Sequence, residues 1–184
     1  MFSAVNFMRV IAGKFRNLNL RGGDNFRPTS DRVRETLFNI LQNEIEGSIF
    51  IDAFAGSGAV GIEALSRGAS KSYFVENNRK ALVVLESNLL LCCEGEKWRI
   101  FSLPAIKALQ VIQQQEPSPD FLYFDPPYDY DQYLELLIES NRHFRSATQI
   151  VETSTRTTVK IPPELIVTKT RAIGETQLIF LRSG

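Results

Sequence analysis

Short apolar runs alternate with amphipathic stretches over most of the chain, and this alternation predicts strands and helices in turn. The runs that favour strands are residues 49–53, 71–76, 98–101, 120–124, 149–152, 164–170 and 176–181. The stretches with helical spacing are residues 60–67, 79–92, 106–115 and 132–141. Strands that alternate with helices form a mostly parallel sheet with helices on both faces. We therefore predict a three-layer α/β fold.

Two smaller elements are predicted ahead of this sheet. Residues 8–21 alternate loosely around Gly13, which favours a β-hairpin. Pro28 indicates a helix entry, and Asp31 suits the first turn because the helix dipole favours an acidic residue there. We predict three parts, with Met8 as an alternative start residue: a flexible extension over residues 1–7, a hairpin and helix over 8–46, and the main domain over 47–184.

Composition narrows the class of protein. With 184 residues, 43% of them hydrophobic and 23% charged, the chain suits one well-buried soluble domain. No apolar stretch approaches the roughly 20 residues of a membrane helix, and the first seven residues do not resemble a signal peptide. The adjacent Cys92 and Cys93, with His143 as the single histidine, cannot supply a tetrahedral metal site. We expect a cytoplasmic monomer with reduced thiols, no membrane contact and no metal.

Charge is unevenly distributed, although the net charge of the chain is zero. Residues 1–35 carry a net charge of +4, so the remainder carries −4. A basic segment on a mildly acidic body suits contacts with nucleic-acid phosphates. A solvated charged face without a partner fits the same charges equally well.

A glycine-rich loop follows the first predicted strand of the main sheet. Gly56, Gly58 and Gly61 have the spacing G-x-G-x-x-G, which allows a tight turn and close approach of the backbone to a ligand. Glu76 lies 20 residues after Gly56 and suits ribose hydroxyls, so the ligand contains adenosine. Asp52 would repel a dinucleotide pyrophosphate, whereas it suits the cationic end of S-adenosylmethionine.

A second motif, Asp125-Pro126-Pro127-Tyr128, follows the apolar run at residues 120–124. The prolines stop the strand and hold the segment stiffly, and ligands bind at the carboxyl ends of strands in open α/β sheets. Asp125 and the Pro126 carbonyl can accept the hydrogens of an exocyclic amino group, and Tyr128 can stack on the base that carries it. The motif therefore indicates a planar base with an amino group.

These motifs carry a resemblance to a known family. In their order, the glycine loop, Glu76 and the Asp125 motif resemble class I S-adenosylmethionine-dependent methyltransferases that act on amino nitrogens. Residues 8–14, 27–39 and 63–69 are similar to the RsmD family, the bacterial 16S ribosomal RNA guanine-N2 methyltransferases. The resemblance runs from Met8 almost to the carboxyl end. It implies a Rossmann-like sheet of about seven strands in the order 3-2-1-4-5-7-6, with the last strand antiparallel.

The resemblance also implies a reaction and a partner. S-adenosylmethionine would donate a methyl group to N2 of a guanine in 16S ribosomal RNA, within an assembled or partly assembled small subunit. We expect catalysis by Asp125, Pro126 and Tyr128. The cofactor-binding candidates are Asp52, Phe54, Gly56, Ser57, Gly58, Glu76 and Ser102. The candidates for RNA phosphate contacts are Arg27, Arg32, Arg34, Lys14 and Arg16.

One departure from the family's pattern follows the third predicted strand. Such enzymes usually carry a small acidic or amide residue there that meets the adenine amino group, and this chain has Ser102, Leu103 and Pro104. We expect Ser102 or a backbone carbonyl to replace that contact. Three alternatives remain at this point: a DNA amino-methyltransferase, an RNA-binding scaffold with a degenerate cofactor pocket, and an NAD-linked dehydrogenase.

Overall fold

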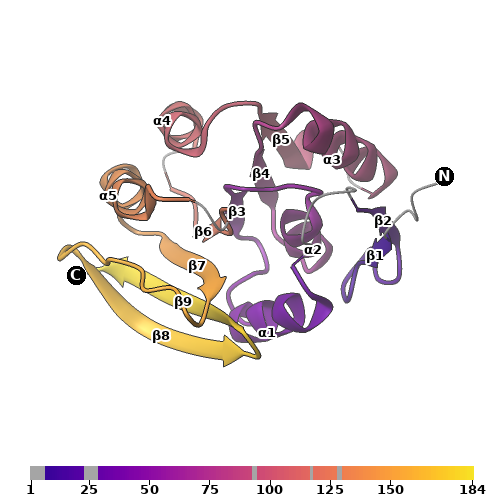
Figure 1. Ribbon diagram of the computed structural model, residues 1–184. Helices are drawn as coiled ribbons and strands as arrows, with labels where there is room; N and C mark the ends of the chain where they lie inside the picture. The colour runs from indigo at the N-terminus through magenta and orange to yellow at the C-terminus, as the bar shows by residue number, and fades with distance from the viewer. Residues whose placement is uncertain (1–6, 23–28, 93–94, 117, 128–129) are drawn as a thin grey trace.

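The computed structural model describes residues 7–22, 29–92, 95–116, 118–127 and 130–184. A seven-stranded sheet forms its centre (Figure 1). In chain order the strands are β3 (Ile49–Asp52), β4 (Lys71–Val75), β5 (Trp98–Phe101), β6 (Phe121–Phe124), β7 (Thr148–Ser154), β8 (Leu165–Ile173) and β9 (Thr176–Ser183). They lie in the order β5-β4-β3-β6-β7-β9-β8. The neighbouring pairs from β5 to β7 are parallel, while β9 is antiparallel to both of its neighbours. The predicted strand order is confirmed.

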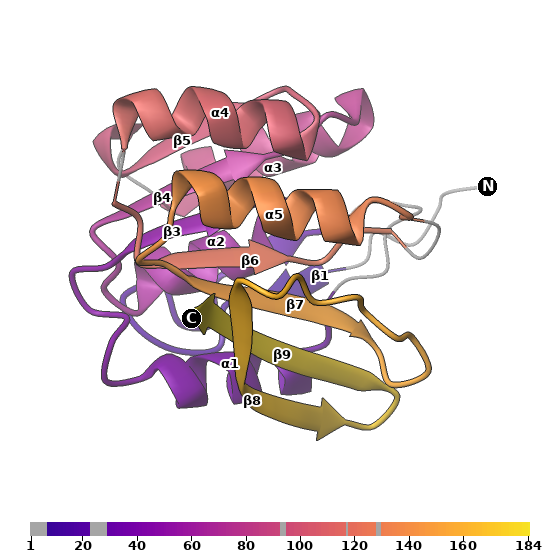
Figure 2. The same ribbon diagram turned by 90° about the vertical axis from the view of Figure 1, so that its left-hand side faces the viewer.

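Helices cover both faces of this sheet. The helices α4 (Ala105–Gln115) and α5 (Tyr133–His143) lie side by side on one face (Figure 2). The other face carries α1 (Asp31–Leu41), α2 (Ala59–Ser66) and α3 (Arg79–Cys92). A short 3-10 turn, Gly95–Lys97, precedes β5. Each predicted strand and helix of the main sheet is present, with bounds within three residues of those expected. None of the described helices is long and apolar enough to cross a membrane.

Alternation along the central strands explains the three layers. Tyr73 and Phe74 are neighbours in β4, yet Tyr73 packs under α4 and Phe74 packs against α2 and α3. Similarly, Phe121 and Tyr123 of β6 face α1, while Leu122 faces α5. Because both faces are covered, β6 is apolar at every position and fully buried.

The predicted hairpin is present as β1 (Phe7–Arg9) and β2 (Asn19–Arg21), and it is docked on α2. The buried Glu63 carboxylate of α2 accepts the backbone N–H groups of Ile11 and Ala12 at 2.8 and 3.0 Å. Gly13 has φ +83°, and a Cβ on it would lie 1.8 Å from the carbonyl oxygen of Ser66. The hairpin loop is therefore fixed against the main domain by close backbone contact.

The first helix also belongs to the packed body of the protein. Leu37 and Phe38 of α1 are fully buried and share a hydrophobic cluster with Phe50 of β3 and Phe121 of β6. Ser30 caps the helix by accepting the N–H of Val33 at 3.3 Å. The division of the chain at residue 46 and the flexible extension over residues 1–7 stay predictions, and residues 1–6 lie outside the described residues.

Arg34 of α1 has no solvent-exposed surface. Its guanidinium donates to the backbone carbonyl of Arg9 at 2.9 Å and to the Asp31 carboxylate at 2.6 Å. It thereby ties the hairpin to α1. A side chain buried in this way offers no surface to an RNA phosphate, so the structure gives Arg34 a structural role in place of the expected RNA contact.

Replacing Arg34 by methionine is expected to lower the free energy of unfolding by about 2–4 kcal/mol, since the hydrogen bonds of a buried cation are lost. Urea unfolding measures this as a lower midpoint at an unchanged slope. Arg32→Met is the matched control, because Arg32 is exposed on the same helix and its loss should change stability by less than about 0.5 kcal/mol. Equal midpoints for the two variants would contradict the structural role of Arg34.

Candidate active site

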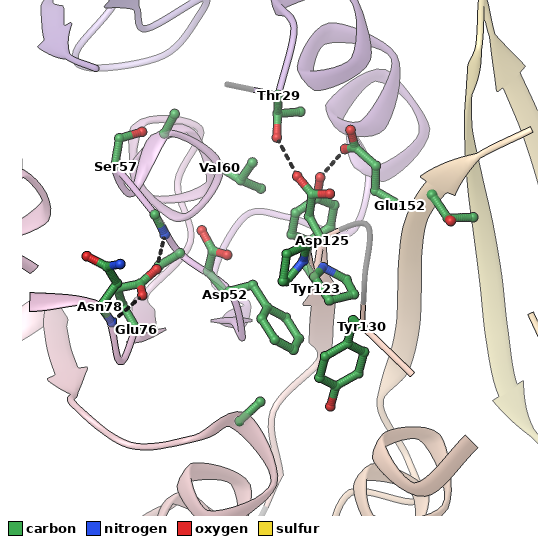
Figure 3. Close-up of a pocket in the computed structure, with 18 of the residues that line it drawn as sticks. Thr29, Asp52, Ser57, Val60, Glu76, Asn78, Tyr123, Asp125, Tyr130 and Glu152 are labelled. Atoms are coloured by element: carbon green, nitrogen blue, oxygen red, sulfur yellow. Dashed lines mark hydrogen bonds between the residues drawn. The ribbon is translucent and has the colours of Figure 1, made fainter. Parts of the chain in front are cut away.

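A cavity of about 750 Å³ opens at the carboxyl ends of β3, β4 and β6. Four acidic side chains contribute to its wall: Asp52 from β3, Glu76 after β4, Asp125 after β6 and Glu152 from β7 (Figure 3). The hairpin contributes Met8 and Gly22 to the rim, and the segment before α1 contributes Thr29 and Ser30. The interior is therefore acidic, and the N-terminal elements border its mouth.

The three glycines of the loop have different tasks. Gly56 has φ +54°, and a Cβ added to it would meet no atom within 4 Å. A Cβ on Gly58, which also has a positive φ, would lie 2.4 Å from a methyl group of Leu85. A Cβ on Gly61 would lie 2.3 Å from the ring of Phe74. Gly56 is thus the glycine of the cavity wall, while Gly58 and Gly61 allow α2 to pack closely.

Asp52 is the most deeply buried acid of the cavity, with 1% of its surface exposed. Its carboxylate accepts the backbone N–H of Gly61 at 3.0 Å. Burial raises the pKa of Asp52 to about 7, and the nearby carboxylates of Asp125 and Glu76 also raise it. Near neutral pH this group either holds a proton or needs a cation beside it.

Glu76 fixes the other side of the glycine loop. One of its carboxylate oxygens accepts the N–H of Gly56 at 2.8 Å, and the other accepts the N–H of Asn78 at 2.7 Å (Figure 3). Both oxygens are therefore held in place next to the cavity. A fixed pair of acceptors of this kind suits a diol.

Aromatic rings form another part of the cavity wall. Tyr130 stands edge-on to Phe54, with ring centroids 5.2 Å apart, and edge-on to Tyr133 at 5.5 Å. All three residues line the cavity. The sequence predicted Phe54 as a site residue, whereas Tyr130 and Tyr133 were missed. Their place two and five residues beyond the Asp125 motif is the signal that would have identified them.

Asp125 and Glu152 each accept a hydrogen bond from a neighbouring hydroxyl group. The hydroxyl of Thr29 donates to the Asp125 carboxylate at 3.1 Å. The Tyr123 hydroxyl donates to the carboxylate of Glu152 (Figure 3). Thr29, Tyr123 and Glu152 were missed by the sequence reasoning. Glu152 alone carried a signal, as an acid at the carboxyl end of a strand beside β6.

The structure brings most of the predicted cavity residues together. Those that line the cavity are Asp52, Phe54, Gly56, Ser57, Glu76, Asp125 and Pro126. Gly58 is buried behind the loop, and Ser102 is exposed and absent from the wall. Pro104, Ala105 and Ile106, at the start of α4, line the cavity where Ser102 was expected. Among the cations, Lys14, Arg16 and Arg32 are exposed. Tyr128 and Arg27 lie outside the described residues.

Comparison with known proteins identifies relatives over nearly the whole chain. The family model described as conserved hypothetical protein 95 matches residues 8–182. The "Ribosomal RNA small subunit methyltransferase D" of Haemophilus influenzae is 36% identical over 173 residues, which cover 91% of this chain and 89% of that protein.

Solved structures agree with these sequence matches. The Escherichia coli protein yhhF superposes with a TM-score of 0.81 at 26% identity, over 97% of this chain and 98% of that one. The Haemophilus influenzae protein HI0767 superposes with a TM-score of 0.75 at 30% identity, over 97% and 99%. These chains share the fold from the hairpin to the last strand.

The raised pKa of Asp52 predicts a pH-dependent stability. Because the folded protein holds this proton more tightly than the unfolded chain does, stability falls as the pH rises from about 4 to about 7. Asp52→Asn removes this titration and keeps an oxygen that can accept the N–H of Gly61. The free energy of unfolding of the variant, relative to the wild type, should therefore increase by about 3 kcal/mol between pH 5 and pH 8.

Urea unfolding of both proteins at pH 5 and pH 8 measures this difference. A difference that is the same at the two pH values would show that Asp52 does not titrate in this range.

Proposed function

This chain belongs to the RsmD family, described by its family model as conserved hypothetical protein 95, and we propose that it methylates ribosomal RNA with S-adenosylmethionine as donor. The observation that carries the proposal is that Asp52, Glu76 and Asp125, from three neighbouring strands, line one cavity. Asp52 and Glu76 belong to the features that the sequence linked to the methyl donor, and Asp125 belongs to the motif that it linked to an amino group.

The residues of the cavity fit S-adenosylmethionine. The buried Asp52 carboxylate suits the ammonium and sulfonium charges, and the fixed oxygens of Glu76 suit the ribose hydroxyls. Gly56 leaves space for close approach, and Pro104 with Ile106 offers an apolar wall for the adenine. A pyrophosphate at the glycine loop would meet the carboxylates of Asp52 and Glu76, which argues against a dinucleotide. When bound, the cofactor supplies a methyl group on a good leaving group.

The chain's own residues then prepare the nucleophile. The Asp125 carboxylate and the Pro126 carbonyl accept the two hydrogens of the guanine N2 amino group and direct its lone pair towards the methyl group. They also stabilise the positive charge that develops on this nitrogen. Thr29 fixes the orientation of Asp125. Tyr128 stacks on the base, as its place in the motif suggests.

The proposed target is a guanine of 16S ribosomal RNA in an assembled or partly assembled small subunit. Exposed cations support a polyanionic partner, because Lys14 and Arg16 on the docked hairpin loop and Arg32 on α1 face solvent. Such cations position a nucleic acid without reading its bases. We also propose that the protein is a monomer and acts in the cytoplasm.

The proposed function is tested by transfer of labelled methyl groups to small ribosomal subunits that lack the modification. We expect label in 16S ribosomal RNA as N2-methylguanine, with little label on duplex DNA of equal mass. Naked 16S ribosomal RNA, added in a separate reaction, distinguishes an assembled from an unassembled substrate. Equal labelling of unrelated DNA would overturn the assignment and favour a DNA amino-methyltransferase.

Asp125→Ala is expected to lower the rate of methyl transfer by about 10²–10³-fold, because a preorganised acceptor for the developing charge is lost. Binding of S-adenosylhomocysteine, measured by calorimetry, should change by less than about threefold, since the acceptors proposed for the cofactor, Asp52 and Glu76, remain. Asp131→Asn is the control, because this neighbouring acid is exposed and does not line the cavity. Unchanged activity of Asp125→Ala would contradict the mechanism.

A further inference from the structure

The cavity has two parts, and the cofactor accounts for only one of them. Asp52, Gly56 and Glu76 lie on the side of β3 and β4. On the other side of Asp125, the wall is formed by β7 and the start of β9, with Glu152, Thr153, Ser154 and Thr176 lining it. This second part remains for the target base. Among the residues that the structure describes, Glu152 is the single acidic side chain of this second part apart from Asp125.

Glu152 is an unusual residue for its position. It is 8% exposed and lies in a strand whose neighbouring residues, Val151 and Thr153, are also buried. A carboxylate at such a place loses its hydration, a cost that an apolar side chain would avoid. The protein nevertheless keeps this group at the wall of the cavity (Figure 3). Its position on the wall places it within reach of a ligand in the cavity.

The neighbours of Glu152 hold it as an acceptor. The hydroxyl of Tyr123 donates to it, and burial keeps the pKa of Tyr123 well above its ordinary value of 10. The tyrosine thus retains its proton, and the carboxylate accepts. Each of the two carboxylates is therefore oriented by one hydroxyl group, Glu152 by Tyr123 and Asp125 by Thr29. Their relative positions are set before a base enters.

The edges of the bases differ in what they offer to two such acceptors. Guanine presents the N1–H donor directly beside its N2 amino group. Adenine presents its N6 amino group beside the lone pair of N1, and cytosine presents its N4 amino group beside the lone pair of N3. A carboxylate is an acceptor with no hydrogen to donate. A pair of acceptors therefore suits guanine and meets a lone pair in the other two bases.

We propose that Glu152 accepts the N1–H of the target guanine while Asp125 and Pro126 hold its amino group, so that Glu152 determines the specificity for guanine. This inference rests on the proposed function and deepens it, because it names the residue that reads the base. A site built to bond a donor rejects an analogue that lacks it far more strongly than an apolar pocket does.

The base 2,6-diaminopurine separates the two contacts, since it keeps the 2-amino group of guanine but has a lone pair at N1. After the labelled guanine has been mapped, 16S ribosomal RNA is ligated with either base at that position and reconstituted into small subunits. Single-turnover methylation by the wild-type protein is expected to be at least about 100-fold slower on diaminopurine. Equal rates would overturn the inference without any variant having to fold.

Glu152→Gln is the informative variant, because its amide has the same size and can donate to the purine N1. The rate on guanine should fall by about 10–100-fold, the loss of one charge-assisted hydrogen bond. The ratio of the rate on guanine to the rate on diaminopurine should fall by at least tenfold. Glu164→Gln, the same change at an exposed residue, should alter neither the rate nor the ratio.

The possible failures are distinguishable. If the wild-type protein labels no guanine of the small subunit, the proposed function itself is wrong. If it labels guanine but Glu152→Gln slows both substrates by the same factor, Glu152 has only a structural role and the specificity inference is wrong. Binding of S-adenosylhomocysteine at wild-type affinity verifies that the variant is folded.

Discussion

The hydrogen bond from the Gly61 amide to the Asp52 carboxylate joins the first turn of α2 to the end of β3, and much of the structure depends on it. The bond requires α2 to lie against β4 so closely that only glycine fits beside Phe74. With α2 in this place, the glycine loop before it forms one wall of the cavity. Glu63 and Ser66, further along the same helix, anchor the hairpin. A single helix thus positions both the glycine loop and the hairpin that carries Lys14 and Arg16.

The same bond holds the Asp52 carboxylate in a buried position that destabilises the ligand-free protein. Burial and the neighbouring acids raise the pKa of Asp52 to about 7, so the ionised form is unfavourable until a positive charge arrives. A cationic ligand relieves this strain, whereas an anionic one adds to it. In the proposed function, the acid interior favours the cationic donor, and the basic hairpin attracts the polyanion. Burial of Asp52 therefore lowers the stability of the protein at the place where the ligand would bind.

The sequence was sufficient for the fold because its strands and helices are strongly periodic and each glycine or proline motif follows a strand. It was insufficient wherever distant segments meet. Thr29 lies 96 residues from Asp125 along the chain, and nothing local to either residue indicates their bond. Arg34 reads as a surface cation in a charged helix, and only the hairpin that covers it makes it a buried one. Ser102, in the turn after β5, lies outside the cavity wall, and the sequence pattern does not specify the geometry of that turn.

Recognition of the RNA then divides between two kinds of contact. Phosphate contacts are the same for every nucleotide, so the cations of the hairpin and α1 cannot identify the base. The identity of the base must be read inside the cavity, by groups whose positions are already fixed when the base arrives. Thr29 lies close to both kinds of contact. It comes two residues before the helix that carries Arg32, and its hydroxyl donates to the Asp125 carboxylate. A docked RNA backbone that moved this segment would move the acceptor as well.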